Sequence, residues 1–272
     1  MKRIMPEESP RERILKRVQT IRVLPTADPV LIAALKVLSD PEASVRDICH
    51  VVRYDSALTS KILSIANSAF YSRGLEVVSV ERAIVAIGYD EVRRIITSLV
   101  FINRVLGGFG VGKEHLLSLF RHSLYVAYAT RVLSLRMLVD HPERLFVISL
   151  LHDIGKLVFF LCEDTYGELL EQSEREGVDV TVLERERFGT DHQEVGEYLS
   201  KRWKFPDVFG RVIGHHHERR PKDTFLEIVS VSDRFSLYPT CDLGDYGFVL
   251  LNAKEAIERE MRRTEALLGI GG

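Results

Sequence analysis

The chain has 272 residues, of which 46% are hydrophobic and 28% charged, a composition typical of a globular protein. Its formal net charge of -2 argues against a general electrostatic grip on nucleic acid, although a local basic patch stays open. The apolar runs are shorter than a membrane span, no signal peptide is recognisable and the three cysteines are isolated, so we expect a cytoplasmic protein without disulfides.

Helical periodicity dominates the first third of the chain. Capping residues followed by apolar spacing predict helix starts at Asp28-Pro29, at Ser44 with Asp47, at Asp55 and at Ser79, and Gly88 can end the last of these helices. A longer helix is expected from Asp90 to Leu106. The stretch from Leu75 to Val80 is the one candidate strand, and a short loop fits it equally well.

Four glycines then fall within six residues, from Gly107 to Gly112, where a helix would be costly to continue. We therefore predict a Gly-rich linker over 107–113 between lobes of residues 12–106 and 114–268. A mobile loop inside one domain is the alternative. Further helices are expected near residues 114–137, 142–162, 164–177, 190–203, 206–217, 222–237 and 245–268, so the predicted fold class is all-α.

The second lobe contains an adjacent His152-Asp153 pair, which offers an imidazole nitrogen and a carboxylate oxygen to a metal. This ligand set suits Fe, Mn, Zn or Mg. A lone histidine on an apolar helix face is more often a hydrogen-bonded core residue, but the convergence of several candidates favours one or two divalent metal ions over a metal-free polar core. The other candidates each lie at or inside an apolar helical stretch: His122, His192, His216, His217 and Asp233.

The surroundings of Asp153 also indicate a charged partner. A buried carboxylate without compensation costs several kcal/mol, so Asp153 needs a cation. Lys156 lies one helical turn later, and it could pair with Asp153 or contact a bound phosphate. We take Asp153 and Lys156 as candidate catalytic residues, because a two-metal centre activates water and clamps phosphate oxygens. Arg219 is a candidate substrate contact, with a solvated charge run as the alternative.

The order His122, His152-Asp153 and Asp233 resembles the ligand order of the HD superfamily of metal-dependent phosphohydrolases. The resemblance implies that these four residues hold a first metal and that three histidines complete a second position: His192, His216 and His217. The HD-GYP branch, which hydrolyses cyclic dinucleotides, has an Asp-Gly-x-Gly-Tyr-Pro loop after its His-His-Glu. That loop is absent after Glu218, so the resemblance does not extend to this activity.

Most of the chain resembles the HDOD domain, the HD-related output domain of bacterial signalling proteins. The matching stretches are Leu24-Pro25, Val52 to Tyr71, Ser79 to Gly88, His192 to Gly196 and Trp203 to Pro206. The resemblance implies an N-terminal helical lobe packed on an HD-like metal-binding lobe. Within it, Asn67-Ser68 is expected to end a helix before Phe70 and Tyr71 enter the core, and a recognition element is the alternative.

This resemblance implies a role in bacterial signal transduction, exerted through a phosphate-containing small molecule, a signalling protein or both. Many HDOD domains lack the His-Asp residues and serve as regulatory modules, whereas this chain keeps the full set. Two functions are therefore open. One is a metal-dependent phosphohydrolase or phosphodiesterase, and the other is a non-catalytic binding module whose metal site is structural or vestigial.

Overall fold

The structure is a computed structural model that describes residues 9–20, 29–53, 55–72, 76–106, 112–218, 221 and 223–270. Within these ranges the regular elements are all helices, which confirms the all-α prediction. Several sequence predictions lie outside the described residues: the Leu24-Pro25 motif, the Asp28 cap, residues 107–111 of the linker, and Arg219. The division into two lobes at that linker stays a prediction.

The helices follow one another along the chain from α1 near the N-terminus to α15 near the C-terminus. They are α1 (Pro10–Thr20), α2 (Pro29–Ser39), α3 (Val45–Arg53), α4 (Ser56–Ala66), α5 (Val80–Ile87), α6 (Tyr89–Val100), the π-helical η2 (Phe101–Leu106), α7 (Lys113–Arg136), α8 (Pro142–Leu151), α9 (Lys156–Cys162), α10 (Tyr166–Glu176), α11 (Val180–Phe188), α12 (His192–Arg202), α13 (Asp207–His215), α14 (Thr224–Leu237) and α15 (Gly244–Leu268).

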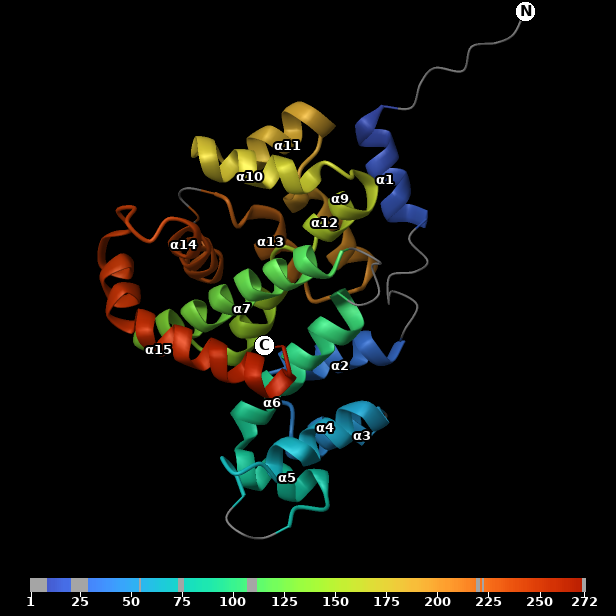
Figure 1. The fold of residues 1–272 in the computed structure, drawn as a ribbon, viewed down its shortest axis with the longest axis vertical. Helices are drawn as coiled ribbons and strands as arrows, with labels where there is room; N and C mark the ends of the chain where they lie inside the picture. Colours follow the sequence, from blue (N-terminus) through green and yellow to red (C-terminus); the bar gives the residue numbers. More distant parts are fainter. Residues whose placement is uncertain are drawn as a thin grey trace, which may run out of the picture.

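The long helix α7 lies in the middle of the molecule and packs against α8, α14 and α15 (Figure 1). Helices α3, α4 and α5 form a group at one end, joined to the rest through α2 and α6. Helix α1 packs instead on α9, α11 and α12 at the other end. One hydrophobic cluster runs through the described residues, from Ile14 in α1 to Ile257 in α15.

Local capping chemistry explains where several helices begin. The Asp55 carboxylate accepts hydrogen bonds from the amides of Ala57 and Leu58, both at 3.0 Å. The Ser79 hydroxyl caps α5, and the Ser44 amide donates to the Asp47 carboxylate at 2.8 Å. These contacts satisfy amides that the first helical turn leaves without intrahelical partners, and they confirm the predicted caps.

Buried arginines of α6 tie the N-terminal helices to the centre of the molecule. Arg93 Nε donates to the Leu38 carbonyl at 2.6 Å. Arg94 Nη1 donates to Glu143 in α8 at 2.7 Å, and Arg131 Nε in α7 donates to the same oxygen at 2.9 Å. Because these ions are buried, each needs its partner to offset desolvation, and the network fixes α6 against α7 and α8.

The loop after α4 shows what the Asn67-Ser68 region does. Asn67 is the C-cap of α4, and its side-chain amide donates to the Val77 carbonyl and accepts from the Val77 amide, both at 2.8 Å. These two hydrogen bonds hold Val77 against the end of α4, and residues 76–79 form a loop, not a strand. Tyr71 is buried as expected, but the expectation for Phe70 was wrong. Its ring is 69% exposed and lies under the Arg263 guanidinium, 4.3 Å from the ring centroid.

The helix predicted over 142–162 is divided into two. Helix α8 ends at Leu151, a turn occupies residues 152–155, and α9 begins at Lys156. By length and composition alone the stretch Pro142–Cys162 could cross a membrane, contrary to our expectation for the sequence, but 83% of its apolar window is buried inside the protein. It is therefore a core segment, and the turn that divides it carries His152 and Asp153.

Candidate metal centre

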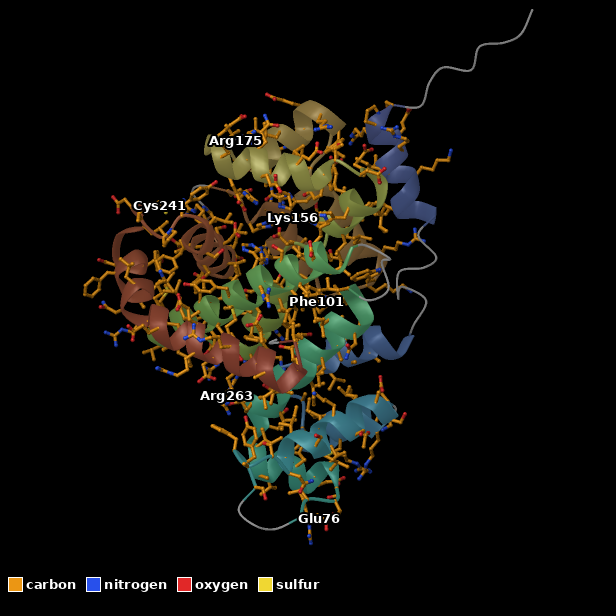
Figure 2. All side chains as sticks on the ribbon, viewed as in Figure 1. Glu76, Phe101, Lys156, Arg175, Cys241 and Arg263 are labelled. Carbon is orange, nitrogen blue, oxygen red and sulfur yellow. The ribbon has the colours of Figure 1, made fainter. Side chains whose placement is uncertain are left out.

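The structure brings the sequence-predicted histidines and aspartates together from five segments. Their positions are His122 within α7, His152 and Asp153 at the turn after α8, His192 at the start of α12, His216 and His217 at the end of α13, and Asp233 within α14. All five segments lie in α7 or after it in the chain. In Figure 2, Lys156, which follows the His152-Asp153 turn, lies far from Glu76 in the α3–α5 group.

Asp153 lies at the centre of the cluster and faces both sides of it. Its Oδ2 is 3.3 Å from His122 Nε2 and 3.5 Å from His152 Nε2. Its Oδ1 is 3.3 Å from His192 Nε2 and 3.5 Å from His216 Nε2. One carboxylate thus faces four imidazole nitrogens, two on each oxygen.

Two half-sites follow from these contacts. The first contains His122, His152, Asp153 and Asp233, whose Oδ1 is 3.1 Å from His122 Nε2 and 3.5 Å from His152 Nε2. The second contains Asp153 with three histidines whose candidate ligand atoms lie within 4.8 Å of one another: His192, His216 and His217. The first half-site is richer in carboxylate oxygen and the second in imidazole nitrogen.

Several buried atoms in this cluster lack hydrogen-bond partners among the described residues. They are His122 Nε2, His152 Nε2 and Asp153 Oδ1. In addition, the Nε2 atoms of His192 and His216 face each other at 3.2 Å. Buried polar atoms are rarely left without partners in folded proteins. These residues therefore fit a cation that would be bound between them.

In His152 and His216, the hydrogen bond made by Nδ1 determines whether Nε2, the nitrogen that faces Asp153, carries a proton. His152 Nδ1 is 2.6 Å from the Ser149 carbonyl, and His216 Nδ1 is 2.9 Å from the Ile213 carbonyl. A carbonyl only accepts, so each Nδ1 carries the proton and donates it. In the neutral ring, Nε2 then presents its lone pair to the centre, as a metal-ligating histidine requires.

His192 is held by a residue that the sequence analysis missed. Glu184 in α11 is fully buried, and its Oε2 lies 2.7 Å from His192 Nδ1 and accepts from the His192 amide at 2.9 Å. The Tyr166 hydroxyl donates to Oε1 at 2.5 Å. A sequence signal existed, because Glu184 lies four residues from both Val180 and Phe188 and therefore on the buried stripe of its helix.

Two glycines allow the helices around the centre to approach closely. A Cβ atom at Gly155 would lie 1.9 Å from the His192 carbonyl oxygen, so the turn after His152-Asp153 can touch the start of α12 only without a side chain. A Cβ atom at Gly196 would lie 2.6 Å from Ile213 Cγ2, which similarly requires glycine between α12 and α13. Both contacts keep His192 and Asp153 together.

A side chain of the protein itself compensates the negative charge of Asp153. Lys156 Nζ lies 2.6 Å from Asp153 Oδ2, so the salt-bridge alternative for Lys156 is present in the structure. Burial alone would raise the pKa of the Asp153 carboxyl, but the charge of Lys156 and the contacts with the surrounding histidines hold it well below its usual value. The carboxylate is therefore ionised at neutral pH.

The histidines differ strongly in their proton affinity. Burial lowers the pKa of His122, but its contacts with Asp153 and Asp233 outweigh burial and raise it to about 9. Burial lowers the pKa of His216 to about 3, with neighbouring histidine charges acting in the same direction. At neutral pH the ion-free centre thus holds a protonated His122 beside Asp233 and a neutral His216.

The remaining histidines lie around the cluster as the sequence suggested. His217 Nδ1 is 3.1 Å from Asp179 at the N-cap of α11, so Asp179 is a second partner that the sequence analysis missed. His215 is exposed and contacts Glu218 at 3.0 Å, which confirms that it points away from its two neighbours. Three others are exposed as expected: His50, His115 and His141.

A cleft opens from the centre toward solvent and has a volume of about 630 Å³. His122, Asp153 and Asp233 form one end of it, together with Lys156 and His217. Its remaining walls come from α7, α9, α10, the start of α11, α14 and the segments next to these helices. A small molecule can therefore reach the buried cluster, as expected of a ligand-binding or catalytic site.

Comparison with known proteins identifies one family. The model of the HDOD domain matches residues 24–219. A protein from Treponema pallidum is 24% identical over 210 residues, which cover 75% of this chain and 39% of that protein. The chain thus spans well under half the length of this relative.

Solved structures share the same fold. A crystal structure of an HDOD domain protein from Geobacter sulfurreducens superposes with a TM-score of 0.69 at 21% identity, covering 88% of this chain and 91% of that one. A protein from Shewanella amazonensis SB2B, provisionally named a phosphohydrolase, gives a TM-score of 0.64 at 20% identity, covering 95% and 96% of the two chains. At these identities the likeness establishes the fold.

Replacing Glu184 tests its role in holding the centre together. We expect Glu184→Ala to lower the free energy of unfolding by about 3 kcal/mol, because the substitution leaves the buried donors of His192 and Tyr166 without their acceptor. The matched control is Glu186→Ala, an exposed glutamate of the same helix, which should change it by less than about 0.5 kcal/mol. Urea denaturation of both variants measures this, and equal midpoints would refute the assignment.

Proposed function

The chain belongs to the HDOD family, and we propose that it is a metal-binding member that hydrolyses a phosphate ester in bacterial signal transduction. The observation that carries the proposal is the Asp153 carboxylate, shared between two pairs of inward-facing imidazole nitrogens. We further propose a cytoplasmic location, and as partner a phosphate-containing small molecule, with or without a signalling protein.

The residues that would hold the ions follow from the half-sites. His122, His152 and Asp233 would hold one ion, and His192, His216 and His217 the other, with Asp153 shared. Fe, Mn, Zn and Mg all suit ligand sets of imidazole and carboxylate, and the nitrogen-rich second half-site favours the transition metals over Mg. Divalent ions at such a site supply an activated water and offset negative charge at phosphorus.

The protein's own groups have separate roles in this proposal. Asp153 positions the two halves relative to each other, and Glu184 orients the His192 ring through Nδ1. Lys156 lines the cleft as well as pairing with Asp153, so its ammonium lies where a phosphate oxygen would approach. Its positive charge would favour an anionic ligand at the buried end of the cleft.

A second candidate function rests on the ion pair between Lys156 and Asp153. Because Lys156 already compensates Asp153 at 2.6 Å, the cluster is electrostatically satisfied in part without metal. A regulatory module that binds a ligand or protein without turnover would retain this arrangement. The two candidates differ in what happens to a bound phosphate ester, which a turnover assay measures directly.

Metal loading is the first expected outcome. Wild-type protein purified without chelator should contain one or two equivalents of Fe, Mn or Zn, and excess metal at about 100 times its dissociation constant should stabilise the fold by about 2.7 kcal/mol. Asp153→Asn should lose this stabilisation, because it removes the shared ligand. The exposed Asp164→Asn variant should keep it. Elemental analysis with thermal unfolding measures both, and an equal shift in all three proteins would contradict the assignment.

Proton competition should make metal affinity depend on pH. The pKa of His122 is raised to about 9, so a metal must displace its proton at every lower pH. We expect affinity for Mn²⁺ to rise by up to about tenfold per pH unit from pH 7 to 9 and then to level off. Competition titration against a chelator of known affinity measures this, and a flat profile over that range would argue against His122 as a ligand.

Turnover separates the two candidate functions. With Mn²⁺ or Fe²⁺ supplied, wild-type protein should release phosphate or alcohol from a panel of mononucleotides, cyclic nucleotides and a chromogenic phosphodiester. His152→Ala and Asp153→Asn should reduce the rate by at least about a hundredfold, since each removes a proposed ligand. Activity that survives both substitutions would come from a contaminant. Absence of turnover in metal-loaded protein would favour the binding module.

A further inference from the structure

The outer part of the cleft carries features that the metal centre does not use. Part of its wall is aromatic or apolar. The His115 ring stacks on Phe160 with centroids 4.9 Å apart and an interplanar angle of 25°, and Leu170 from α10 lines the same cleft. Leu237 and Tyr238, at the end of α14, line it as well. A bound ligand would therefore have an organic part in contact with these walls.

Charge is segregated along the cleft. The lysine and the arginine that line it, Lys156 and Arg234, follow the proposed ligands Asp153 and Asp233 by three residues and by one residue. The carboxylates of the cleft that are not proposed ligands include exposed ones, whereas Lys156 is buried. Glu171 and Glu174 are exposed on α10, one helical turn apart and therefore on one face.

The same acidic character continues around the mouth of the cleft. Asp242 lines it from the segment after α14, and Asp179 lines it from the N-cap of α11, where it is paired with His217. Burial and then the charges of Asp179 and Glu174 raise the pKa of the Tyr238 hydroxyl, so Glu174 acts on Tyr238 across the cleft. Among the described residues, neither Glu171 nor Glu174 forms an ion pair of its own.

We propose that the acidic rim of Glu171, Glu174 and Asp242 selects phosphate esters whose organic part carries a cationic amine. This inference rests on the proposed function, because it takes the phosphate to occupy the buried end of the cleft. An ammonium group on the organic part would then face the rim carboxylates and the ring of Tyr238, both of which attract cations. A second phosphate in that position would be repelled.

The acidic residues do not carry this inference alone. The cleft is lined by Asp153, whose buried Oδ1 has no hydrogen-bond partner among the described residues and therefore indicates a ligand at its inner end. The rim adds a second charge of opposite sign to the one expected at the inner end. The shape of the site thus matches a molecule that is anionic at one end and cationic at the other.

The experiment compares two ligands that differ in one ammonium group. Calorimetric titration of metal-loaded wild-type protein with O-phosphoethanolamine and with ethyl phosphate gives the ratio of their affinities. We expect O-phosphoethanolamine to bind about three- to tenfold more tightly, since two carboxylates at several ångströms act through partly screened water. Inorganic phosphate serves as the reference for the inner end alone.

Matched variants assign the preference to the rim. The double variant Glu171→Gln with Glu174→Gln should bring the affinity ratio close to one, and it should bind pyrophosphate more tightly than wild type does. The control is Glu168→Gln with Glu176→Gln, which removes the same charge from the same helix outside the cleft lining. The control should keep the wild-type ratio. All four residues are exposed, so folding should be unaffected.

The outcomes distinguish this inference from the proposed function. If all three phosphates bind but the ratio is near one in wild type, or is unchanged in the rim variant, the acidic rim does not select amines and the proposed function stands. If inorganic phosphate and both esters fail to bind metal-loaded protein, the proposed function is refuted and this inference with it.

Discussion

The burial of one carboxylate is the constraint on which the rest of the centre depends. Asp153 is 1% exposed, and an ionised carboxylate at such a position needs cations or donors on every side. The protein supplies them from α7, α8, α9, α12 and α13, so the helices that carry these groups must converge there. These helices therefore surround a buried cluster of charged and polar side chains.

This constraint also explains the irregular backbone at that point. A continuous helix over 142–162 would place Asp153 on a cylinder among apolar side chains. The break after Leu151 instead turns its carboxylate toward four histidines, and Gly155 lets the turn lie directly against the start of α12. Carbonyl and carboxylate partners at Nδ1 then set the ring orientations of His152, His192 and His216. Local hydrogen bonds orient some of these rings, whereas the contact between Gly155 and His192 is tertiary.

Much of this could be predicted from the sequence, because the signals are local or chemical. The caps at Asp55 and Ser79 depend on residues within one turn, and the histidine and aspartate set was recognisable from ligand type and apolar setting. The break between α8 and α9 was not predictable, since its cause is a contact between Gly155 and His192, 37 residues apart in the printed sequence. Glu184 was missed because helix α11 itself was not expected.

The pairing of Lys156 with Asp153 has a consequence for how such a protein is assembled. Because an ammonium group belonging to the chain neutralises the buried carboxylate, the core can close around Asp153 while the ion is still in solution. If the centre binds metal as proposed, folding would come first, and loading through the open cleft would add stability to a chain that is already folded. Under the proposed function, protein made while metal is scarce would therefore be folded before it is loaded.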